Sequence, residues 1–530
     1  MLYLQDISYI HPNKDLLFEN INLAVNNHEK IALVGKNGSG KSTLLRIVNG
    51  ELIPAGGRIE KPNSIYYIPQ IFGQYNHLTV AQALKVDHKI HALTKILKGQ
   101  YSEENYTHLQ DDWTIESRCQ EALNHWKLGF TDLSQKMGSL SGGQKTKVLL
   151  ACINIHQPRL ILMDEPSNHL DLESRKQLYH FIEMSPATMV IVSHDRKLLN
   201  LLDTICELHQ TGLTTYGGNY AFYQQQKILE QSALEQDIQG KEKLLREARN
   251  KQRETLERQQ KQQARGRKKQ AKSGMPKVMM DKMKNDSENR FSKLKHAHAG
   301  KVDGIHQDLK ALRAALPDPD KMRFDFDPSD LHQGKILFQA YKINYQYASE
   351  WVWKSSLSMQ IKSGERIALK GANGSGKTTL IKVVLGNLIP QVGTFKSNTN
   401  KALYIDQDYS LIDNRLSVCE QANQYNSLGL PDHEVKTRLN RFLFGKESWD
   451  KPCQALSGGE RMRLMLCCLN IGQQAPDLII LDEPTNNLDI QNIEILTNAI
   501  NSYKGTLIVV SHDEDFIEDV RIERTIELTY

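Results

Sequence analysis

A duplicated glycine-rich motif constrains this chain more than any other feature. GKNGSGKS at Gly35–Ser42 recurs as GANGSGKT at Gly371–Thr378, an offset of 336 residues. The flanks repeat as well, because Tyr9 and Tyr345 each lie 26 residues before the first glycine of the motif. Repetition over this distance indicates two copies of one structural unit.

Three further motifs recur in the same order. They are LSGGQ at 140–144 and LSGGE at 456–460, LMDEP at 162–166 and LDEP at 481–484, and SHD at 193–195 and 511–513. These later offsets are 316 or 318, so the first copy carries about 20 extra residues between Gln70 and Leu140. We therefore predict three regions: a first unit at 1–220, a connector at 221–330 and a second unit at 331–530.

Within each unit, short apolar segments alternate with helical stretches. The predicted buried strands are Ile31–Val34, Leu160–Met163 and Met189–Val192 in the first copy, and Arg366–Leu369, Leu478–Leu481 and Leu507–Val510 in the second. Strands that alternate with helices favour an α/β fold with a mostly parallel sheet.

The connector has a different character. Residues 222–264 are rich in Gln, Glu, Lys, Arg and Leu, contain a single glycine and no proline, and so predict one long helix. A basic turn is expected over Gly266–Gly274. The returning segment carries an apolar seam spaced mostly three and four residues apart: Phe291, Leu294, His298, Val302, Ile305, Leu309, Leu312 and Leu316. We predict a helical hairpin whose tip lies at about 265–285.

Charge is distributed unevenly along the chain. Residues 241–310 hold 21 Lys/Arg and 9 Asp/Glu, a net charge of +12, whereas the remainder carries −7. A Lys/Arg-rich helix is commonly a solvated coiled coil, but a single-signed excess on a hairpin also suits an RNA partner. The predicted RNA contacts are Arg265, Arg267, Lys268, Lys269 and Lys272.

The sequence has neither a long apolar segment nor cysteines at metal-binding or redox spacing. The longest wholly apolar runs, Val148–Ile153 and Leu464–Leu469, have six residues, and a membrane-spanning helix needs about 20. The N-terminus lacks the basic start and apolar stretch of a signal peptide. The seven cysteines show no CxxC or metal-ligand spacing, which predicts reduced thiols in a cytoplasmic protein. No transmembrane partner is expected.

The GxxxxGK[ST] pattern predicts a phosphate-binding loop in each copy. Glycines allow backbone N–H groups to point at a phosphate, and the following helix N-terminus favours an anion. Lys41 and Lys377 supply charge to the phosphates, while Ser42 and Thr378 supply a hydroxyl for Mg²⁺. The predicted ATP-binding residues are Gly35, Asn37, Gly38, Ser39, Gly40, Lys41, Ser42, Thr43, Gly371, Asn373, Gly374, Ser375, Gly376, Lys377, Thr378 and Thr379.

A carboxylate pair follows an apolar strand in each copy. Asp164 and Asp482 end these strands, where a carboxylate is placed to hold Mg²⁺. The adjacent Glu165 and Glu483 are candidates for the general base that accepts a proton from an attacking water.

With LSGGQ and LSGGE, the motif set resembles the ATP-binding cassette superfamily over both units. The resemblance implies that the signature of one domain caps the nucleotide held by the other. Lys41 would then face Ser457 and Gly459, and Lys377 would face Ser141 and Gly143.

The same resemblance assigns three more pairs of residues. Gln70 and Gln407 match the glutamine near Mg²⁺ and the attacking water, and His194 and His512 match the switch histidines at the γ-phosphate. Tyr9 and Tyr345 match the aromatic residue that stacks on adenine. Both copies keep every catalytic group, so both sites are expected to hydrolyse ATP.

Two tandem cassettes and a helical linker resemble the ABC-F family, which acts on the ribosome. The resemblance implies a monomer whose cassettes close on each other, and a linker that reaches peptidyl-tRNA, rRNA and the peptidyl-transferase region from the tRNA exit site. The alternative is the fused ATPase subunit of a membrane importer, which lacks such a hairpin. A DNA-organising ATPase would need longer arms than 110 connecting residues. The sequence leaves translation regulation and protection against ribosome-targeting antibiotics both open.

Overall fold

The structure is a computed structural model that describes most of the chain. The described residues are 1–70, 73–129, 132–270, 292, 296, 299–313, 334–348, 350–372, 374–398, 401–427, 429–472, 476–486 and 488–528. They fall into two compact units. One comprises Met1–Tyr220 with Pro319–Tyr530, and the other is Ala221–Asp318.

The first sequence copy is built on a six-stranded sheet in the order β5-β6-β7-β3-β8-β9. All neighbouring strands run parallel except β8 and β9. The strands are β3 (Lys30–Val34), β5 (Ile65–Ile68), β6 (Leu160–Asp164), β7 (Thr188–Val192), β8 (Thr204–His209) and β9 (Gly212–Gly217). Every residue of β6 and β7 is buried, as expected for strands of a parallel sheet that is covered on both faces.

The second copy repeats this plan with five parallel strands in the order β16-β17-β18-β14-β19. They are β14 (Arg366–Lys370), β16 (Ala402–Ile405), β17 (Leu478–Asp482), β18 (Thr506–Val510) and β19 (Arg524–Glu527). All six predicted strands are present in these two sheets.

Each copy also has a small antiparallel sheet. In the first copy it comprises β1 (Leu2–Ile10), β2 (Leu16–Val25) and β4 (Gly56–Glu60). In the second copy it comprises β10 (Ile336–Asn344), β13 (Leu357–Lys362) and β15 (Val392–Ser397), beside a hairpin of β11 (Gln346–Tyr347) and β12 (Glu350–Trp351).

Helices follow the strands in matched positions. The first copy has α1 (Lys41–Asn49), α2 (Val80–Ala83), α5 (Ile115–His125), α6 (Gly142–His156), α7 (Leu172–Met184) and α8 (Arg196–Asn200). The second has α11 (Lys377–Val384), α12 (Val418–Gln424), α13 (Asp432–Arg441), α14 (Gly458–Gly472), α15 (Ile490–Ser502) and α16 (Glu514–Asp519). All seven cysteines are free thiols, as predicted.

The extra length of the first copy forms a helical pair, α3 (Asp87–Leu97) and α4 (Glu103–Leu109), between α2 and α5. Ala92, Leu93 and Ile96 of α3 and Leu109 of α4 are buried. The second copy joins α12 directly to α13 over residues 425–431.

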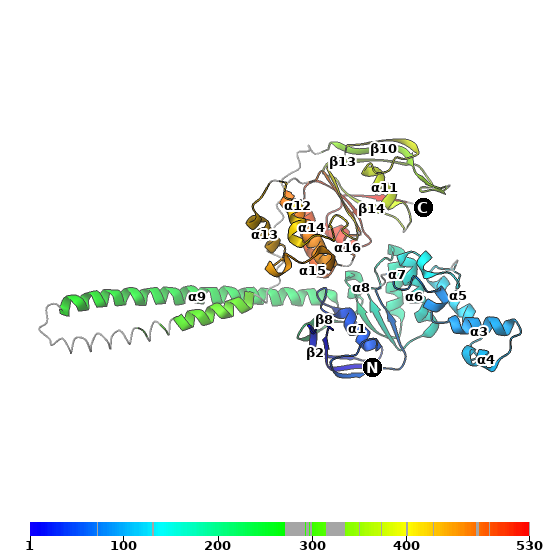
Figure 1. The fold of residues 1–530 in the computed structure, drawn as a ribbon, viewed down its shortest axis with the longest axis horizontal. Helices are drawn as coiled ribbons and strands as arrows, with labels where there is room; N and C mark the ends of the chain where they lie inside the picture. Colours follow the sequence, from blue (N-terminus) through cyan, green and yellow to red (C-terminus); the bar gives the residue numbers. More distant parts are fainter. Residues whose placement is uncertain are drawn as a thin grey trace. The chain divides into compact units, whose positions relative to one another are not determined.

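The second unit is a helical hairpin. Helix α9 runs without interruption from Tyr220 to Gln270, which corresponds to about 76 Å (Figure 1). Residues 299–313 are helical as well, and ion pairs join Lys241 to Asp308 and Glu242 to Arg313. Both ion pairs join one turn of α9 to the returning helix, so the two helices pack against each other.

The apolar seam of the hairpin is formed in part as predicted. Leu309 is 3% exposed and Ile238 of α9 is 8% exposed, while Val302, Ile305 and Leu312 are half-buried. The α/β class with a helical hairpin linker is therefore confirmed.

The predicted start of the basic turn is wrong. Residues 266–270 continue α9 instead of leaving the helix at Gly266. A single glycine costs a helix only about 1 kcal/mol, and the Arg, Lys and Gln residues around it are good helix formers. The remainder of the predicted tip, 271–285, lies outside the described residues.

Candidate nucleotide-binding sites

The first phosphate loop joins β3 to α1. Gly38 and Gly40 have φ of 81° and 97°, the left-handed region that glycine adopts without strain. A Cβ on Gly40 would also lie 2.8 Å from the Phe18 ring. The Lys41 ammonium donates to the carbonyl oxygens of Gly35 at 2.7 Å and Lys36 at 3.2 Å. The loop therefore curls around the ammonium that is expected to meet a phosphate.

The second loop repeats this arrangement between β14 and α11. Lys377 donates to the carbonyls of Gly371 at 2.7 Å and Ala372 at 3.1 Å, and Gly376 has φ of 85°. Asn373, one of the predicted ATP contacts, lies outside the described residues. The two loops therefore share the contacts of their lysine and the left-handed glycine before it.

An aspartate ends β6 and β17, the strand next to the edge of each parallel sheet, and lies beside the loop. The Tyr67 hydroxyl donates to Asp164 at 3.4 Å, and the Tyr404 hydroxyl donates to Asp482 at 2.8 Å. Burial raises the pKa of both aspartates, while Lys41 acts against the rise at Asp164 and Lys377 at Asp482. A bound cation would stabilise the ionised form of both carboxylates.

The residues around Asp164 fit a magnesium ion. Its Oδ1 atom is buried and has no hydrogen-bond partner within the described part of the chain. Mg²⁺ prefers hard oxygen ligands and usually keeps several waters. The Asp164 carboxylate and the Ser42 hydroxyl would supply such oxygens, and Gln70 lines the same cavity.

The two candidate bases share one geometry. The His194 backbone N–H donates to Glu165 at 3.4 Å, and its ring Nε2 lies 3.5 Å from the same carboxylate. His512 and Glu483 repeat both distances. Glu165 and Glu483 have φ of 51° and 48°, an unusual conformation for a non-glycine residue. Strain of this kind persists where the surrounding structure fixes it, as is common at functional sites.

Burial sets the protonation of these groups. It raises the pKa of Glu165 to about 8, with a further contribution from neighbouring Asp164. It raises the pKa of Glu483 to about 7, with the charge of Arg175 acting against the rise. Burial lowers the pKa of His194 well below its usual value and that of His512 to about 4, so both imidazoles are neutral near pH 7.

The signature serines cap the helices that follow them. The Ser141 hydroxyl accepts from the N–H of Gln144, whose side chain accepts from the N–H of Ser141. Ser457 and Glu460 form the same reciprocal capping box. The change from Gln to Glu therefore preserves the local structure of the signature.

A cavity of about 870 Å³ brings the first loop together with the second signature. From the first copy it is lined by Lys41, Ser42, Gln70, Asp164, Glu165 and His194, among others. From the second copy, Ser457 and Gly458 line it. In addition, the Asn37 backbone N–H donates at 2.9 Å to Asp489, the residue that caps α15. These groups surround one cavity in which a nucleoside triphosphate would contact both copies.

The second loop lies against a smaller cavity of about 270 Å³. Gly371, His512 and Asp171 line this cavity, whereas its described lining does not include Ser141 or Gly143. Gln407, predicted to lie near Mg²⁺ at the second site, lines the larger first cavity instead. The roles predicted for these residues at the second site therefore stay predictions.

Comparison with known proteins identifies the family. The sequence model of the ABC transporter family matches residues 18–168 and 355–486. ATP-binding protein Uup of Escherichia coli K12 is 31% identical, over 96% of this chain and 76% of Uup. ABC transporter F family member 5 of Arabidopsis thaliana is 28% identical, over 97% of this chain and 72% of its own length.

The chain belongs to the ABC-F type of tandem ATP-binding cassette proteins. A chain in a solved structure described as a model of ribosome-bound archaeal Pelota and ABCE1 has the same fold, with a TM-score of 0.59 and 18% identity. The match covers 98% of this chain and 76% of that one. Among the described helices of this ABC-F protein, none combines the length and the apolar character that a membrane span requires.

The stacking of Tyr9 and Tyr345 on adenine stays a prediction. Tyr9 packs against the core, whereas His11, two residues later, lines the first cavity. In the second cassette the Tyr345 ring packs edge-on against Tyr347, whose hydroxyl lies 3.5 Å from that of Thr379.

The predicted RNA-binding residues are only partly described. Arg265 is exposed on α9. Arg267, Lys268 and Lys269 belong to the same helix, but their side chains are not described, and Lys272 lies outside the described residues. Their role in RNA binding stays a prediction.

Proposed function

We propose that this ABC-F protein hydrolyses ATP and uses the cycle to act on the ribosome. Each phosphate loop binds one nucleotide. Ser42 and Asp164 would hold Mg²⁺ in the first site, and Thr378 and Asp482 would hold it in the second. Lys41 and Lys377 bind the phosphates, and Mg²⁺, when bound, neutralises charge that develops on them.

Glu165 and Glu483 orient and deprotonate the attacking water as general bases. A carboxylate with a pKa near the working pH is suited to accept a proton. The neutral imidazoles of His194 and His512 donate a hydrogen bond to the terminal phosphate without carrying a permanent charge. ATP closes the two cassettes of the monomer on each other, and hydrolysis releases them.

The ribosomal part of the proposal is carried by the hairpin unit. Exposed cations follow one another along α9: Lys243, Arg246, Arg249, Lys251, Arg253, Arg258, Lys261 and Arg265. Cations on a helix gain free energy when they displace counterions from RNA phosphates. Membership of the ABC-F family supports the ribosomal function over the alternative of a fused importer ATPase.

In the proposed action, the protein binds in the tRNA exit site in the cytoplasm. The hairpin then contacts rRNA and peptidyl-tRNA near the peptidyl-transferase region. The result is either regulation of translation or protection from ribosome-targeting antibiotics.

Co-sedimentation with ribosomes across a KCl series tests the role of the hairpin. The protein would carry Glu165→Gln and Glu483→Gln to hold ATP, with or without Gln at the five predicted tip cations. Neutralisation should weaken ribosome binding and flatten its salt dependence by somewhat under one log–log unit per lost phosphate contact.

The matched control replaces each Arg by Lys and each Lys by Arg at the same five positions. This variant keeps the charge and should keep the slope of the salt dependence. Parallel salt curves for the neutralised and the original tip would contradict the assignment of this segment to RNA binding.

A further inference from the structure

A buried arginine breaks the symmetry between the two cassettes. The segments from Asp164 to His194 and from Asp482 to His512 align at a constant offset of 318 residues. At this offset Arg175 of α7 corresponds to Ile493 of α15. The arginine therefore has no equivalent in the second cassette.

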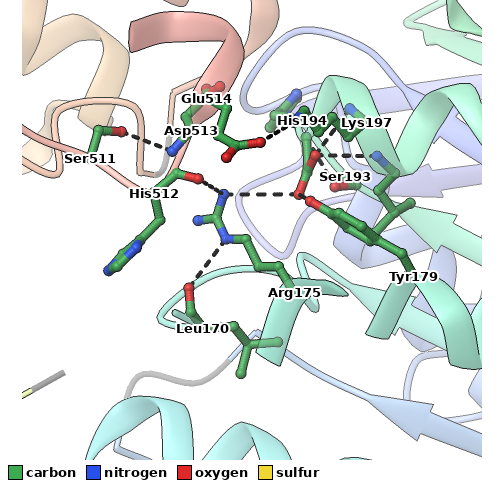
Figure 2. Close-up of polar contacts among 12 residues, drawn as sticks. Leu170, Arg175, Tyr179, Ser193, His194, Lys197, Ser511, His512, Asp513 and Glu514 are labelled. Carbon is green, nitrogen blue, oxygen red and sulfur yellow. Dashed lines mark hydrogen bonds and ion pairs between the residues drawn. The ribbon is translucent and has the colours of Figure 1, made fainter. Parts of the chain in front are cut away.

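Arg175 connects three segments, two in the first cassette and one in the second. Its Nε donates to the Leu170 carbonyl at 3.2 Å, and its Nη1 donates to the His512 carbonyl at 3.4 Å (Figure 2). The same Nη1 lies 3.9 Å from Asp195, and the residue is only 7% exposed. A buried charge of this kind is stable only when carboxylates and carbonyls surround it.

These contacts link the two switch segments. Asp195 directly follows His194 in the first cassette, and the carbonyl that Arg175 holds in the second cassette belongs to His512 itself. The N–H of His512 donates in turn to the Glu483 carboxylate. A single side chain of the first cassette therefore supports the backbone next to the candidate base of the second site.

On the opposite side, the described part of α15 offers no equivalent of the arginine. Ile493 lines the same small pocket as Arg175 but has no donor. The Tyr179 hydroxyl donates a hydrogen bond to Asp195 at 2.5 Å. The residue equivalent to Tyr179 in the second cassette is Thr497, whose hydroxyl has no hydrogen-bond partner among the described residues. Among the described residues, the polar network is thus supplied by Arg175 and Tyr179 of the first cassette.

We infer that Arg175 is a positioning residue for hydrolysis at the second site: it holds the His512 segment in line with Glu483 and ties it to the segment after His194. This inference rests on the proposed ATP hydrolysis. Ile493 supplies no matching donor to the first site among the described residues, so hydrolysis there should not depend on position 493.

Site-resolved kinetics test the inference. Glu165→Gln leaves only the second site to hydrolyse ATP, and Glu483→Gln leaves only the first. Adding Arg175→Ile should lower kcat about tenfold in the Glu165→Gln protein, because the His512 segment loses its support. KM for ATP should change less than twofold, since Arg175 touches no nucleotide-binding residue of the loop. In the Glu483→Gln protein, kcat should change less than twofold.

Two variants separate positioning from a general effect on the interface. Arg175→Lys keeps the charge but not the forked donor geometry, so second-site kcat should lie between the original and the isoleucine values. Lys197→Gln removes a neighbouring ion pair between α8 and Glu514 without touching His512, and should slow neither site more than twofold.

The exchange of Arg175→Ile with Ile493→Arg keeps the total charge but moves it to the other cassette. The second site should stay slow in this double variant. Equal slowing of both sites by Arg175→Ile, or of neither, would overturn the inference. Absence of hydrolysis in both single-site proteins with Arg175 in place would instead overturn the proposed function.

Discussion

The two cassettes share their candidate catalytic groups, but the described side chains around those groups differ. At the first site, Ser457 and Gly458 of the other cassette line the cavity that holds Lys41. In the second cassette, Gly371 and His512 line the described cavity beside the loop. Among the described residues, the repeated motifs therefore keep their sequence while the side chains that line the cavities beside them differ.

The phosphate-binding lysines and the candidate bases of the two sites also differ in burial. Lys41 is 7% exposed, whereas Lys377 is half-buried. The pKa of Glu165 is raised to about 8 by burial, and that of Glu483 only to about 7 with Arg175 nearby. The first site is therefore the more enclosed of the two.

The segments that follow the switch histidines have diverged into opposite charges. Helix α8 begins with Arg196 and Lys197, and α16 begins with Glu514. Arg196 pairs with Asp519 at 2.8 Å, and Lys197 pairs with Glu514. Two identical subunits would bring like charges together here. The charge pattern thus favours pairing of the first cassette with the second.

The largest effect is expected from removing the phosphate-binding lysines. Lys41→Ala and Lys377→Ala should each lower steady-state ATP turnover at least tenfold, equivalent to about 1.4 kcal/mol, because each removes a charge that the phosphates need. Full activity in both single variants would show that the two sites are not coupled parts of one ATPase.

A smaller loss is expected from Asp489→Ala. This change removes the N-cap of α15, which costs about 1 kcal/mol of stability, and also the acceptor for the Asn37 N–H. Asp171→Ala removes the equivalent cap of α7 and is the matched control. Thermal unfolding should shift similarly in both variants, while ATP turnover at the first site should fall further in Asp489→Ala. Equal turnover would mean that the contact to Asn37 has no role in closing the first site.

Reversal of the charge pair between α8 and α16 should have a modest effect. Lys197→Glu should destabilise the protein by about 1 kcal/mol or less, because exposed ion pairs contribute little, and the loss should shrink at high salt. Combining it with Glu514→Lys should restore stability. If the double reversal is no better than the single change, the pair does not stabilise the contact between the cassettes.

The smallest effect is expected from removing the extra helical pair of the first cassette. Replacement of residues 86–113 by the short connection 425–431 should leave ATP turnover within twofold, since α3 and α4 contribute no residue to either cavity. A tenfold loss would make this pair part of the catalytic unit.

The sequence was sufficient for the features that short-range patterns encode. Buried parallel strands read as unbroken apolar runs, and Asp164 and Asp482 follow such runs directly. The glycine loops and the long helix were predicted for equally local reasons. The fold class and the family followed from these patterns.

Features that depend on contacts between the repeats were not predicted. Arg175 looked like an ordinary helical residue because its partners, Asp195 and His512, are distant in sequence. The break between Arg175 and Ile493 in otherwise matched segments was the available signal. The predicted turn at Gly266 failed for a different reason, because neighbouring helix formers outweighed one glycine.

Purification of the Glu165→Gln, Glu483→Gln protein from cells tests the central claim most directly. An amide at both positions removes the proton acceptor, so ATP should hold the cassettes closed. We expect ribosomes to co-purify with this protein, to be lost when Lys41→Ala and Lys377→Ala are added, and protein synthesis in an extract to be inhibited. Recovery of the ATP-loaded protein free of ribosomes, with protein synthesis unchanged at saturating amounts, would contradict the account.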